Sequence, residues 1–399
     1  SMRIAALFEV LNLPPEPRAK PTLLADELKQ FRYINGSLFA DMLPIADFNE
    51  KMRETLLDCC RFQWSKISPA IFGAMFQGVM DKTQRRELGA HYTSEENILK
   101  LINPLFLDEL WAEFDRVKTD PIGLARFHDK IAALKFLDPA CGCGNFLIIT
   151  YRELRRLELE ILKMQRGSNQ LMLDISHLMR VSVAQFYGIE YEDFPCQIAQ
   201  VGMWLIDHQM NTLFSEHFGL YFARLPLTTA ATIVHGNALR TGWESIVPRH
   251  ELSVIMGNPP FNGARTMNED QKLDMLHVFG NLKGVGNLDY VTAWYKKAAD
   301  MMTGTQIQSA FVSTNSISQG EQAALLWKPL MQEKSVHINF GYRTFKWSNE
   351  AKGKAAVHCV IIGFSIHQTK RERMIFESDG SIATAQNINP YLVNADNVF

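Results

Sequence analysis

Short apolar runs alternate with amphipathic stretches from about residue 86 onward, and this alternation constrains the fold more than any other feature of the chain. Five runs have the length and apolar character of buried strands: 133–138, 185–190, 231–236, 252–257 and 309–314. The stretches 145–165 and 193–214, which separate the first three runs, carry apolar residues at helical spacing. Repetition of strand, helix and strand predicts an α/β protein with a doubly wound, mostly parallel, Rossmann-like sheet.

Two later apolar runs, 335–342 and 356–366, lie close together along the chain. A short polar link between them predicts an antiparallel hairpin at the edge of the sheet. The α/β domain is therefore expected to cover residues 86–380. Residues 381–399 have little periodicity and are interpreted as the start of a linker.

Residues 1–85 follow a different pattern, because they lack β-rich runs and carry apolar residues at helical spacing in 23–34 and 48–67. This segment is predicted to be a separate all-α domain. The Ser1-Met2 start is typical of a cloning remnant, so we expect the chain to be a piece of a longer protein.

The composition is that of an ordinary folded protein, with 47% hydrophobic and 21% charged residues. A net charge of −2 argues against a small DNA-coating protein, but it is compatible with an enzyme that has a local basic surface. Six cysteines without a paired framework indicate a reducing compartment. No signal peptide or membrane-spanning run is visible, and a cytoplasmic location is expected.

A loop of small residues, LDPACGCGNF (137–146), follows the first predicted strand and precedes a helix. Ligands bind at this position in open parallel sheets, and Gly142 and Gly144 allow a close approach of the backbone. Asp138 would repel a pyrophosphate but could hold an ammonium group, which favours S-adenosylmethionine over a dinucleotide. The remaining candidates for cofactor contacts here are Ala140, Asn145 and Phe146. A tight turn without a ligand remains the alternative.

The ends of the next two predicted strands supply further candidates. Glu190 could accept hydrogen bonds from a ribose diol, although it lies farther from the glycine loop than a compact nucleotide unit requires. Asn237 could contact an adenine edge through its amide, and Ala238 follows it. The alternative for Glu190 is a solvated charge at a strand end.

The fourth predicted strand ends in GNPPF (257–261). The side-chain oxygen of Asn258 and the main-chain oxygen of Pro259 could grip the two hydrogens of a planar NH₂ group. Pro259 and Pro260 fix φ and stiffen the loop, and Phe261 could stack on the ring that carries the amine. The predicted chemistry is direct transfer of a methyl group to that nitrogen, stabilised by fixed dipoles. A rigid loop that only caps the strand is the alternative.

Other polar features give weaker indications. Cys141 and Cys143 lack a second ligand pair, so no metal site is predicted. The aromatic and basic segment around Phe345 and Trp347 could contact a flipped base, and the residues do not decide between the two rings. TNSISQG (314–320) could line the target pocket or simply cap the next helix.

The glycine loop and NPPF together resemble the amino-methylating class I S-adenosylmethionine-dependent methyltransferases, in the form associated with N6-adenine methylation of DNA. LGAHYTSEENILKLI (88–102) is similar to the segment that closes over the cofactor in adenine methyltransferases of restriction systems. That resemblance implies that Tyr92 and Thr93 line the cofactor pocket.

The chain is more specifically similar to the MmeI-like (type IIL) restriction–modification proteins, through WSKISPAIFGAMFQ, LPLTTAATIVHGNALRTGW and NINPYLVNADNVF. The resemblance covers nearly the whole chain. It implies that residues 1–85 are a helical connector, that double-stranded DNA is the partner, and that a nuclease and a target-recognition domain are missing from this chain. Nuclease chemistry of this type needs an aspartate upstream of an E-x-K; Glu27-Leu28-Lys29 has only the adjacent Asp26 before it, and Glu350-Ala351-Lys352 has no nearby upstream aspartate, so no nuclease is predicted in this chain.

Two other functions remain open at this point. A protein methyltransferase that acts on a glutamine amide would use the same loop chemistry, although such enzymes usually carry tyrosine after the prolines. A non-catalytic DNA-binding subunit with a relic fold would not need an intact Asp138 or Asn258. Cofactor binding would distinguish this last possibility.

Overall fold

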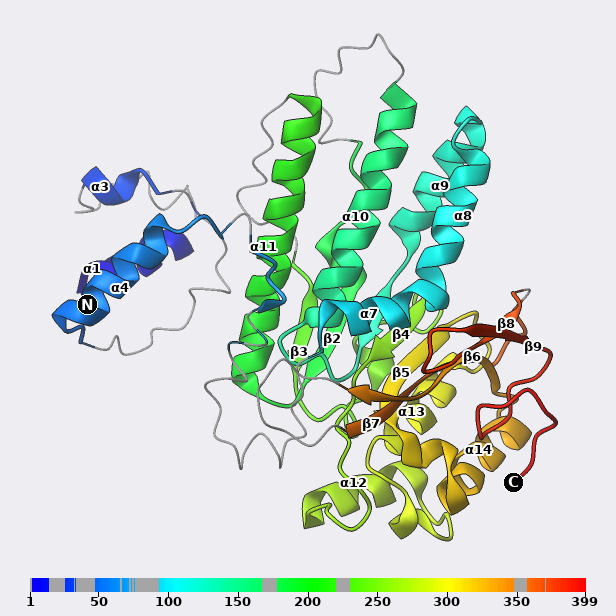
Figure 1. The fold of residues 1–399 in the computed structure, drawn as a ribbon. Coiled ribbons are helices and arrows are strands. Elements are labelled where there is room, and N and C mark those ends of the chain that lie inside the picture. The colour runs from blue at the N-terminus through cyan, green and yellow to red at the C-terminus, as the bar shows by residue number, and fades with distance from the viewer. Residues whose placement is uncertain are drawn as a thin grey trace.

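The computed structural model describes residues 2–13, 26–31, 33, 47–64, 67–71, 73, 75, 93–166, 178–219, 230–347, 357–369 and 371–399. Tyr92 and the segment 348–356 lie outside these residues. The described strands form one sheet of nine, in the order β3-β2-β1-β4-β5-β7-β6-β8-β9 (Figure 1). Their bounds are β1 Phe136–Asp138, β2 Phe186–Glu190, β3 Thr232–His235, β4 Val254–Gly257, β5 Gln308–Thr314, β6 His337–Trp347, β7 Val357–Ser365, β8 Arg373–Phe376 and β9 Ile382–Ala385.

The first five strands are all parallel, which confirms the predicted doubly wound α/β fold. The chain reverses its strand order between β1 and β4, because β1 pairs with β2 on one side and with β4 on the other. The carboxyl ends of these neighbouring strands therefore share one edge of the sheet, where ligands bind in folds of this type.

The predicted antiparallel pair is present, but it does not form the edge of the sheet. β7 lies between β5 and β6 and runs antiparallel to both. β8 then pairs parallel to β6, and β9 pairs antiparallel to β8. The sheet therefore continues beyond residue 380, where a linker was expected. The boundaries of the three domains remain predictions.

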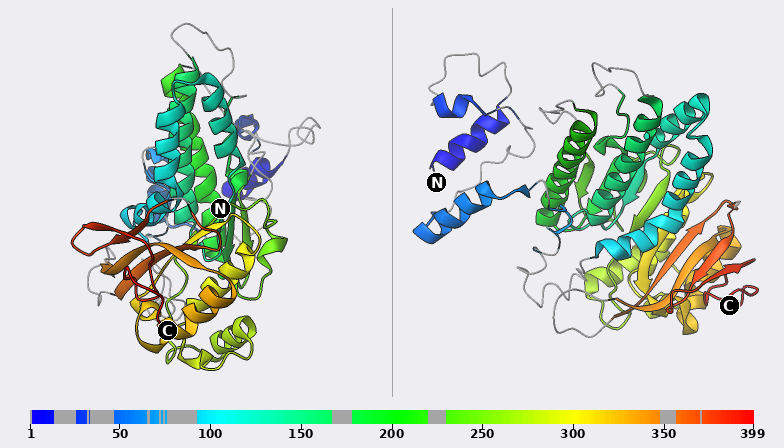
Figure 2. Two further views of the ribbon diagram at one scale, coloured as in Figure 1. Left: turned by 90° about the vertical axis from the view of Figure 1, so that its right-hand side faces the viewer. Right: turned by 45° about the horizontal axis from the view of Figure 1, so that its top comes forward.

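Helices cover both faces of the sheet (Figures 1 and 2). One face packs against α7 Glu95–Ile102, η2 Asn103–Leu107, α8 Asp108–Val117, α9 Pro121–Ala133, α10 Asn145–Arg166 and α11 Asp193–Phe218. The other face packs against α12 Glu269–Phe279, α13 Thr292–Met302 and α14 Gly320–Glu333. Short helical turns η3 Val183–Gln185, η4 Trp243–Ser245, η5 Val285–Asn287 and η6 Asn315–Ser318 connect the larger elements.

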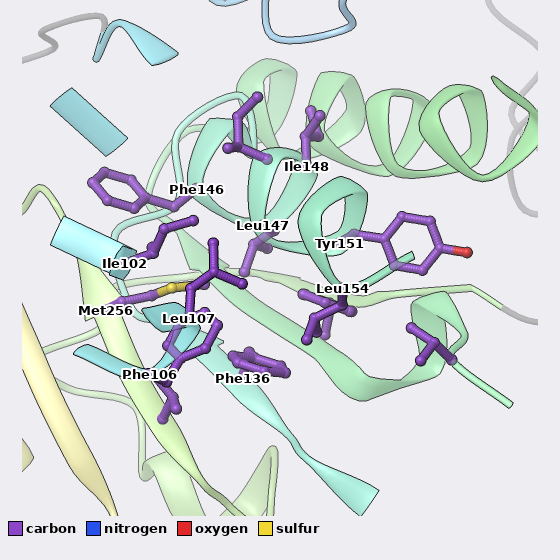
Figure 3. Packing of buried hydrophobic residues seen from close by; sticks show 14 of the residues in the cluster. Ile102, Phe106, Leu107, Phe136, Phe146, Leu147, Ile148, Tyr151, Leu154 and Met256 are labelled. Carbon is purple, nitrogen blue, oxygen red and sulfur yellow. The ribbon is translucent and has the colours of Figure 1, made fainter. Parts of the chain in front are cut away.

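Alternation along β1 divides the core between the two faces, since Phe136 belongs to one hydrophobic cluster and Leu137 to the other. Phe136 stacks on Phe186 of β2 with ring centroids 5.1 Å apart, and it meets Phe106 of η2 at 5.2 Å. Figure 3 shows Phe146 and Leu147, from the first turn of α10, in this same cluster. The start of α10 is thereby fixed against the sheet directly behind the glycine loop.

A buried polar network links the helices on the first face. Arg155 and Glu158 of α10 have no exposed surface, and Nε of Arg155 lies 3.4 Å from a carboxylate oxygen of Glu158. Glu158 also accepts from the backbone N–H of Val181 at 2.9 Å and lies 3.0 Å from Nε2 of His128. Arg155 donates to the side-chain oxygen of Asn211 in α11 at 3.0 Å. The network therefore joins α9, α10 and α11.

The described part of residues 1–85 includes the helices α1 Met2–Asn12, α3 Asp26–Lys29 and α4 Glu50–Arg61. The side chain of Gln209 in α11 donates to the carbonyl oxygens of Trp64 and Ile67, at 3.0 and 2.7 Å. Among the described residues, none of the helices has the length and apolarity needed to cross a bilayer.

Candidate active site

The glycine loop joins the end of β1 to α10 with two residues in left-handed backbone conformations. Gly142 has φ +53° and Gly144 has φ +84°, which residues with a Cβ rarely adopt. A Cβ on Gly144 would lie 3.0 Å from the Cβ of Ala199 in α11, so this helix also requires a glycine there. The first N–H groups of α10, those of Asn145 and Phe146, have no acceptor within the helix and can serve as donors to a ligand.

Asp138 ends β1 beneath this loop and is completely buried. Its Oδ1 accepts the N–H of Ala140 at 3.0 Å, whereas its Oδ2 is buried without a hydrogen-bond partner. Burial raises the pKa of the Asp138 carboxyl to about 8; the Ala140 hydrogen bond opposes this rise and the charge of Glu190 adds to it. A Cβ on Gly257, at the end of β4, would lie 2.4 Å from Oδ1. Glycine at that position therefore makes room for the carboxyl.

Glu190 ends β2, the strand beside β1, and holds the backbone of two loops. Its carboxylate accepts the N–H of Gly142 at 2.8 Å and that of Glu192 at 3.0 Å. Burial raises the pKa of the Glu190 carboxyl, although these backbone hydrogen bonds oppose the rise. The adjacent Tyr191 has 59% of its surface exposed, and it was not singled out from the sequence.

The amide of Asn237, after β3, already has partners within the protein. Its side-chain nitrogen donates to Oδ2 of Asp274 in α12 at 2.8 Å, and its side-chain oxygen accepts the N–H of Leu239 at 2.9 Å. Asp274 also accepts from Nε of Arg240, at 2.6 Å. This arrangement fixes the loop after β3. The adenine contact expected of Asn237 remains a prediction, because the amide has a second hydrogen and a second lone pair.

Asn258 and Thr93, which lie 165 residues apart in sequence, meet at the edge of the sheet. Nδ2 of Asn258 donates to the hydroxyl oxygen of Thr93 at 2.9 Å, and Oδ1 of Asn258 is buried without a partner. Pro259 is buried and Pro260 is half-buried. The half-buried ring of Phe261 packs against both hydrophobic clusters. The orientation of this amide leaves Oδ1 of Asn258 available to accept a hydrogen bond from a ligand.

Three buried side-chain oxygens of the site lack a hydrogen-bond partner: Oδ2 of Asp138, Oδ1 of Asn145 and Oδ1 of Asn258. The two amide oxygens can only accept hydrogen bonds, and Oδ2 of Asp138 accepts when its carboxyl is ionised, so the arrangement is suited to a ligand that brings N–H donors or positive charge. Within the described residues, no group of three His, Cys, Asp or Glu side chains could hold a metal ion.

Other sequence candidates occupy different places. The ring of Phe146 lies in the core, so its side chain is not available to a ligand (Figure 3). The half-buried Phe345 packs against the same core cluster, with Nζ of Lys100 5.8 Å from its ring centroid. The side chain of Trp347 and the whole of Tyr92 fall outside the described residues.

Helix α13 holds two of the loops that carry candidate residues, and the sequence reasoning missed it. Nε1 of Trp294 donates to the carbonyl oxygen of Pro139 at 3.0 Å. Nζ of Lys297 donates to the carbonyl oxygens of Ala238 and Thr241 at 2.7 and 2.6 Å. The only signal in the sequence was that Trp294 and Lys297, which carry hydrogen-bond donors, occur within a mostly apolar stretch.

Comparison with known proteins adds to this geometry. A family model described as the DNA-methyltransferase domain of MmeI matches residues 114–377. DNA methyltransferase A of Bacillus subtilis (strain 168) is 42% identical over 375 residues, which are 93% of this chain and 42% of that protein. The solved structure of the type IIL restriction–modification enzyme MmeI in complex with DNA is similar over 100% of this chain and 53% of that chain, with 53% identity and a TM-score of 0.94.

A more distant structure, the type IIG restriction endonuclease BpuSI, is similar over 94% of this chain and 37% of that chain. Its identity of 13% and TM-score of 0.52 show a shared fold alone. The chain spans about half the length of the first two relatives, at 42% and 53% of their residues.

Proposed function

This chain belongs to the family of MmeI DNA-methyltransferase domains, and from that premise we propose that it transfers a methyl group from S-adenosylmethionine to N6 of an adenine in DNA. The observation that carries the proposal is the buried, unpartnered Oδ1 of Asn258 beside the glycine loop. This oxygen sits at the end of β4, next to the end of β1 where the cofactor is expected.

The residues present fit S-adenosylmethionine. Asp138 offers a buried acceptor to the cofactor ammonium, and Asn145 offers a second. Nothing lies within 4 Å of the position that a Cβ on Gly142 would take, which leaves room for a ligand there, while the first N–H groups of α10 can bind a carboxylate. We infer that Glu190 binds the ribose and that the exposed ring of the adjacent Tyr191 stacks on the adenine of the cofactor. When bound, the cofactor supplies an electrophilic methyl group on a sulfonium.

The chain itself orients the nucleophile. Oδ1 of Asn258 and the carbonyl oxygen of Pro259 accept hydrogen bonds from the two N–H groups of the adenine NH₂. These hydrogen bonds direct the nitrogen lone pair away from the ring and toward the methyl group. Thr93 holds the Asn258 amide through a 2.9 Å hydrogen bond, so this acceptor keeps its direction. Phe261 supplies an apolar surface for the flipped base. Fixed dipoles of this kind need no reorganisation during the reaction.

The finer assignments rest on the family and on this geometry. We infer that the chain acts in the cytoplasm as the modification part of a restriction–modification protein, with double-stranded DNA as partner. A nuclease and a target-recognition domain are expected elsewhere in the natural protein.

The test expresses the full-length gene in a bacterium that lacks adenine methylation, and it sequences genomic DNA by a method that reads modified bases directly. N6-methyladenine in one defined sequence motif is the expected result, and the Asn258→Ala variant should leave the same DNA unmodified. Unmodified DNA in the presence of a wild-type protein that binds the cofactor would refute the adenine assignment. That outcome would favour a protein amide as the acceptor.

A further inference from the structure

Asp289 is a buried carboxylate that joins three segments around the far side of the site. It lies between η5 and α13 and has 5% of its surface exposed. Its Oδ1 accepts the backbone N–H of Ala264 at 3.0 Å and Nε2 of Gln322 in α14 at 3.1 Å. Its Oδ2 accepts the hydroxyl of Thr314, the last residue of β5, at 3.0 Å.

The backbone beside Asp289 strengthens the same connection. The N–H of Tyr290 donates to the carbonyl oxygen of Asn262 at 2.9 Å, and the N–H of Asp289 donates to Oε1 of Gln322 at 3.1 Å. Asn262 and Ala264 follow directly after the NPPF segment. The chain is therefore held at two points as it leaves Phe261.

All the partners of this carboxylate are neutral. Among the described residues no ion pair involves Asp289, so its negative charge is stabilised by an amide N–H, a side-chain amide and a hydroxyl. A hydroxyl can accept as well as donate. An asparagine at this position could therefore keep Oδ1 as the acceptor for Ala264 and Gln322, and donate from its NH₂ group to Thr314. An alanine would leave all three partners without an acceptor.

We propose that Asp289 is a positioning residue for methyl transfer, because it sets the exit of the NPPF loop against the tip of β5. β5 is the neighbour of β4 on the side away from β1, so this contact builds the wall that faces the target base rather than the cofactor. The role rests on the proposed function. It depends on hydrogen-bond acceptance and not on charge.

The test compares Asp289→Ala with Asp289→Asn in the full-length protein, with Glu321→Gln as the control for an exposed carboxylate next to Gln322. Three quantities are measured: kcat on DNA from a bacterium without adenine methylation, the Kd of S-adenosylmethionine, and hydrogen exchange of the amides in 258–264. A displaced reacting group lowers rate steeply, so Asp289→Ala should lower kcat by about tenfold or more. Its cofactor Kd should stay within about twofold of wild type, since the cofactor loops are held elsewhere.

Hydrogen exchange of the amides in 258–264 should be faster in Asp289→Ala than in wild type. Asp289→Asn and Glu321→Gln should match wild type in all three measurements. If Asp289→Ala does not fold, Thr314→Val removes one donor from the same carboxylate and should shift kcat and exchange in the same direction by a smaller factor. Unchanged exchange in the Ala or Val variant would overturn the proposal. Equal loss of kcat in Asp289→Asn and Asp289→Ala would also overturn it, because charge would then be the property that matters.

These outcomes separate the proposal from the function on which it rests. A wild-type protein that binds no cofactor, or that leaves DNA unmodified, would refute the proposed function. The exchange of 258–264 would still decide whether Asp289 holds the loop, because that measurement needs neither cofactor nor DNA.

Discussion

The buried Asp138 makes cofactor affinity depend on pH, and the direction follows from its surroundings. Its carboxyl is completely buried and its pKa is raised to about 8, so the cofactor-free protein holds it mostly neutral at pH 6. A cofactor ammonium favours the ionised form, because an opposite charge within a few ångströms lowers the pKa of a carboxyl. Binding below pH 8 should therefore release a proton.

The expected size of the effect comes from the raised pKa. Ionising a group with a pKa of about 8 at pH 6 costs about 2.7 kcal/mol, or about a hundredfold in affinity, at 1.36 kcal/mol per pH unit. The Kd of S-adenosylmethionine should fall by about tenfold per pH unit up to about pH 8 and then level off.

The free energy of unfolding of the cofactor-free protein should change in the opposite direction to the cofactor affinity, because the contribution of Asp138 to it falls as pH rises. Between its unfolded pKa of 3.8 and its folded pKa of about 8, only the folded state holds the proton, so this contribution is lost as pH rises.

Isothermal titration calorimetry at several pH values, in pairs of buffers with different ionisation enthalpies, measures both the affinity and the number of protons released. Asp138→Asn is the matched control, because it keeps the shape of the side chain and removes its titration. We expect this variant to bind the cofactor weakly and with little dependence on pH. A wild-type Kd that stays constant from pH 6 to pH 8, without proton release, would refute the reasoning.

Three further substitutions test other parts of the structure. Asn258→Ala should abolish methyl transfer and leave cofactor affinity within about twofold, because its free oxygen serves only the acceptor NH₂ group; substantial turnover would contradict the mechanism. Gly257→Ala would place a methyl group 2.4 Å from the Asp138 carboxyl, so cofactor binding in a direct titration should be lost, and wild-type affinity would contradict the close approach. Glu158→Leu leaves the buried Arg155 without its ion-pair partner and should lower the free energy of unfolding, measured by urea titration, by about 3–5 kcal/mol. A loss below about 1 kcal/mol would show that the network contributes little to stability.

Much of the sheet was predictable because its strands are buried on both faces and read as apolar runs. The ends of β1, β2 and β4 carry Asp138, Glu190 and Asn258, and the parallel fold alone was sufficient to bring these strand ends to one edge. The predicted start of the first run at residue 133 was too early, because α9 continues to Ala133. Helix and strand cannot be distinguished in such short apolar runs by periodicity.

The two outer strands were missed for a physical reason. β8 and β9 have only four residues each; β8 is half-buried apart from the buried Ile375, and β9 is largely exposed. Short strands at an edge carry little apolar alternation, so the pattern that identifies central strands is absent. β8 pairs with β6 and β9 pairs with β8, and the local composition of these two strands does not indicate either partner.

The supporting residues of the site were also not predictable. Asp274 and Asp289 look like ordinary helix-surface and loop carboxylates in the sequence, yet both are at least 95% buried in the fold. Their partners come from loops and strands that approach them only in three dimensions. The groups proposed to touch ligands could be chosen from the sequence, because they form compact local motifs. The sequence could not identify the groups that hold them.

The way α13 is connected limits how this site can change. One stiff helix is bonded through Trp294 to the loop after β1 and through Lys297 to the loop after β3, and the residue before its N-terminal cap is bonded to the segment after β4. Any substitution that tilts this helix would displace all three loops together, so they cannot be adjusted one at a time. New target preferences in proteins of this design are therefore expected to arise from parts of the chain that α13 does not touch, with the reaction centre inherited as one unit.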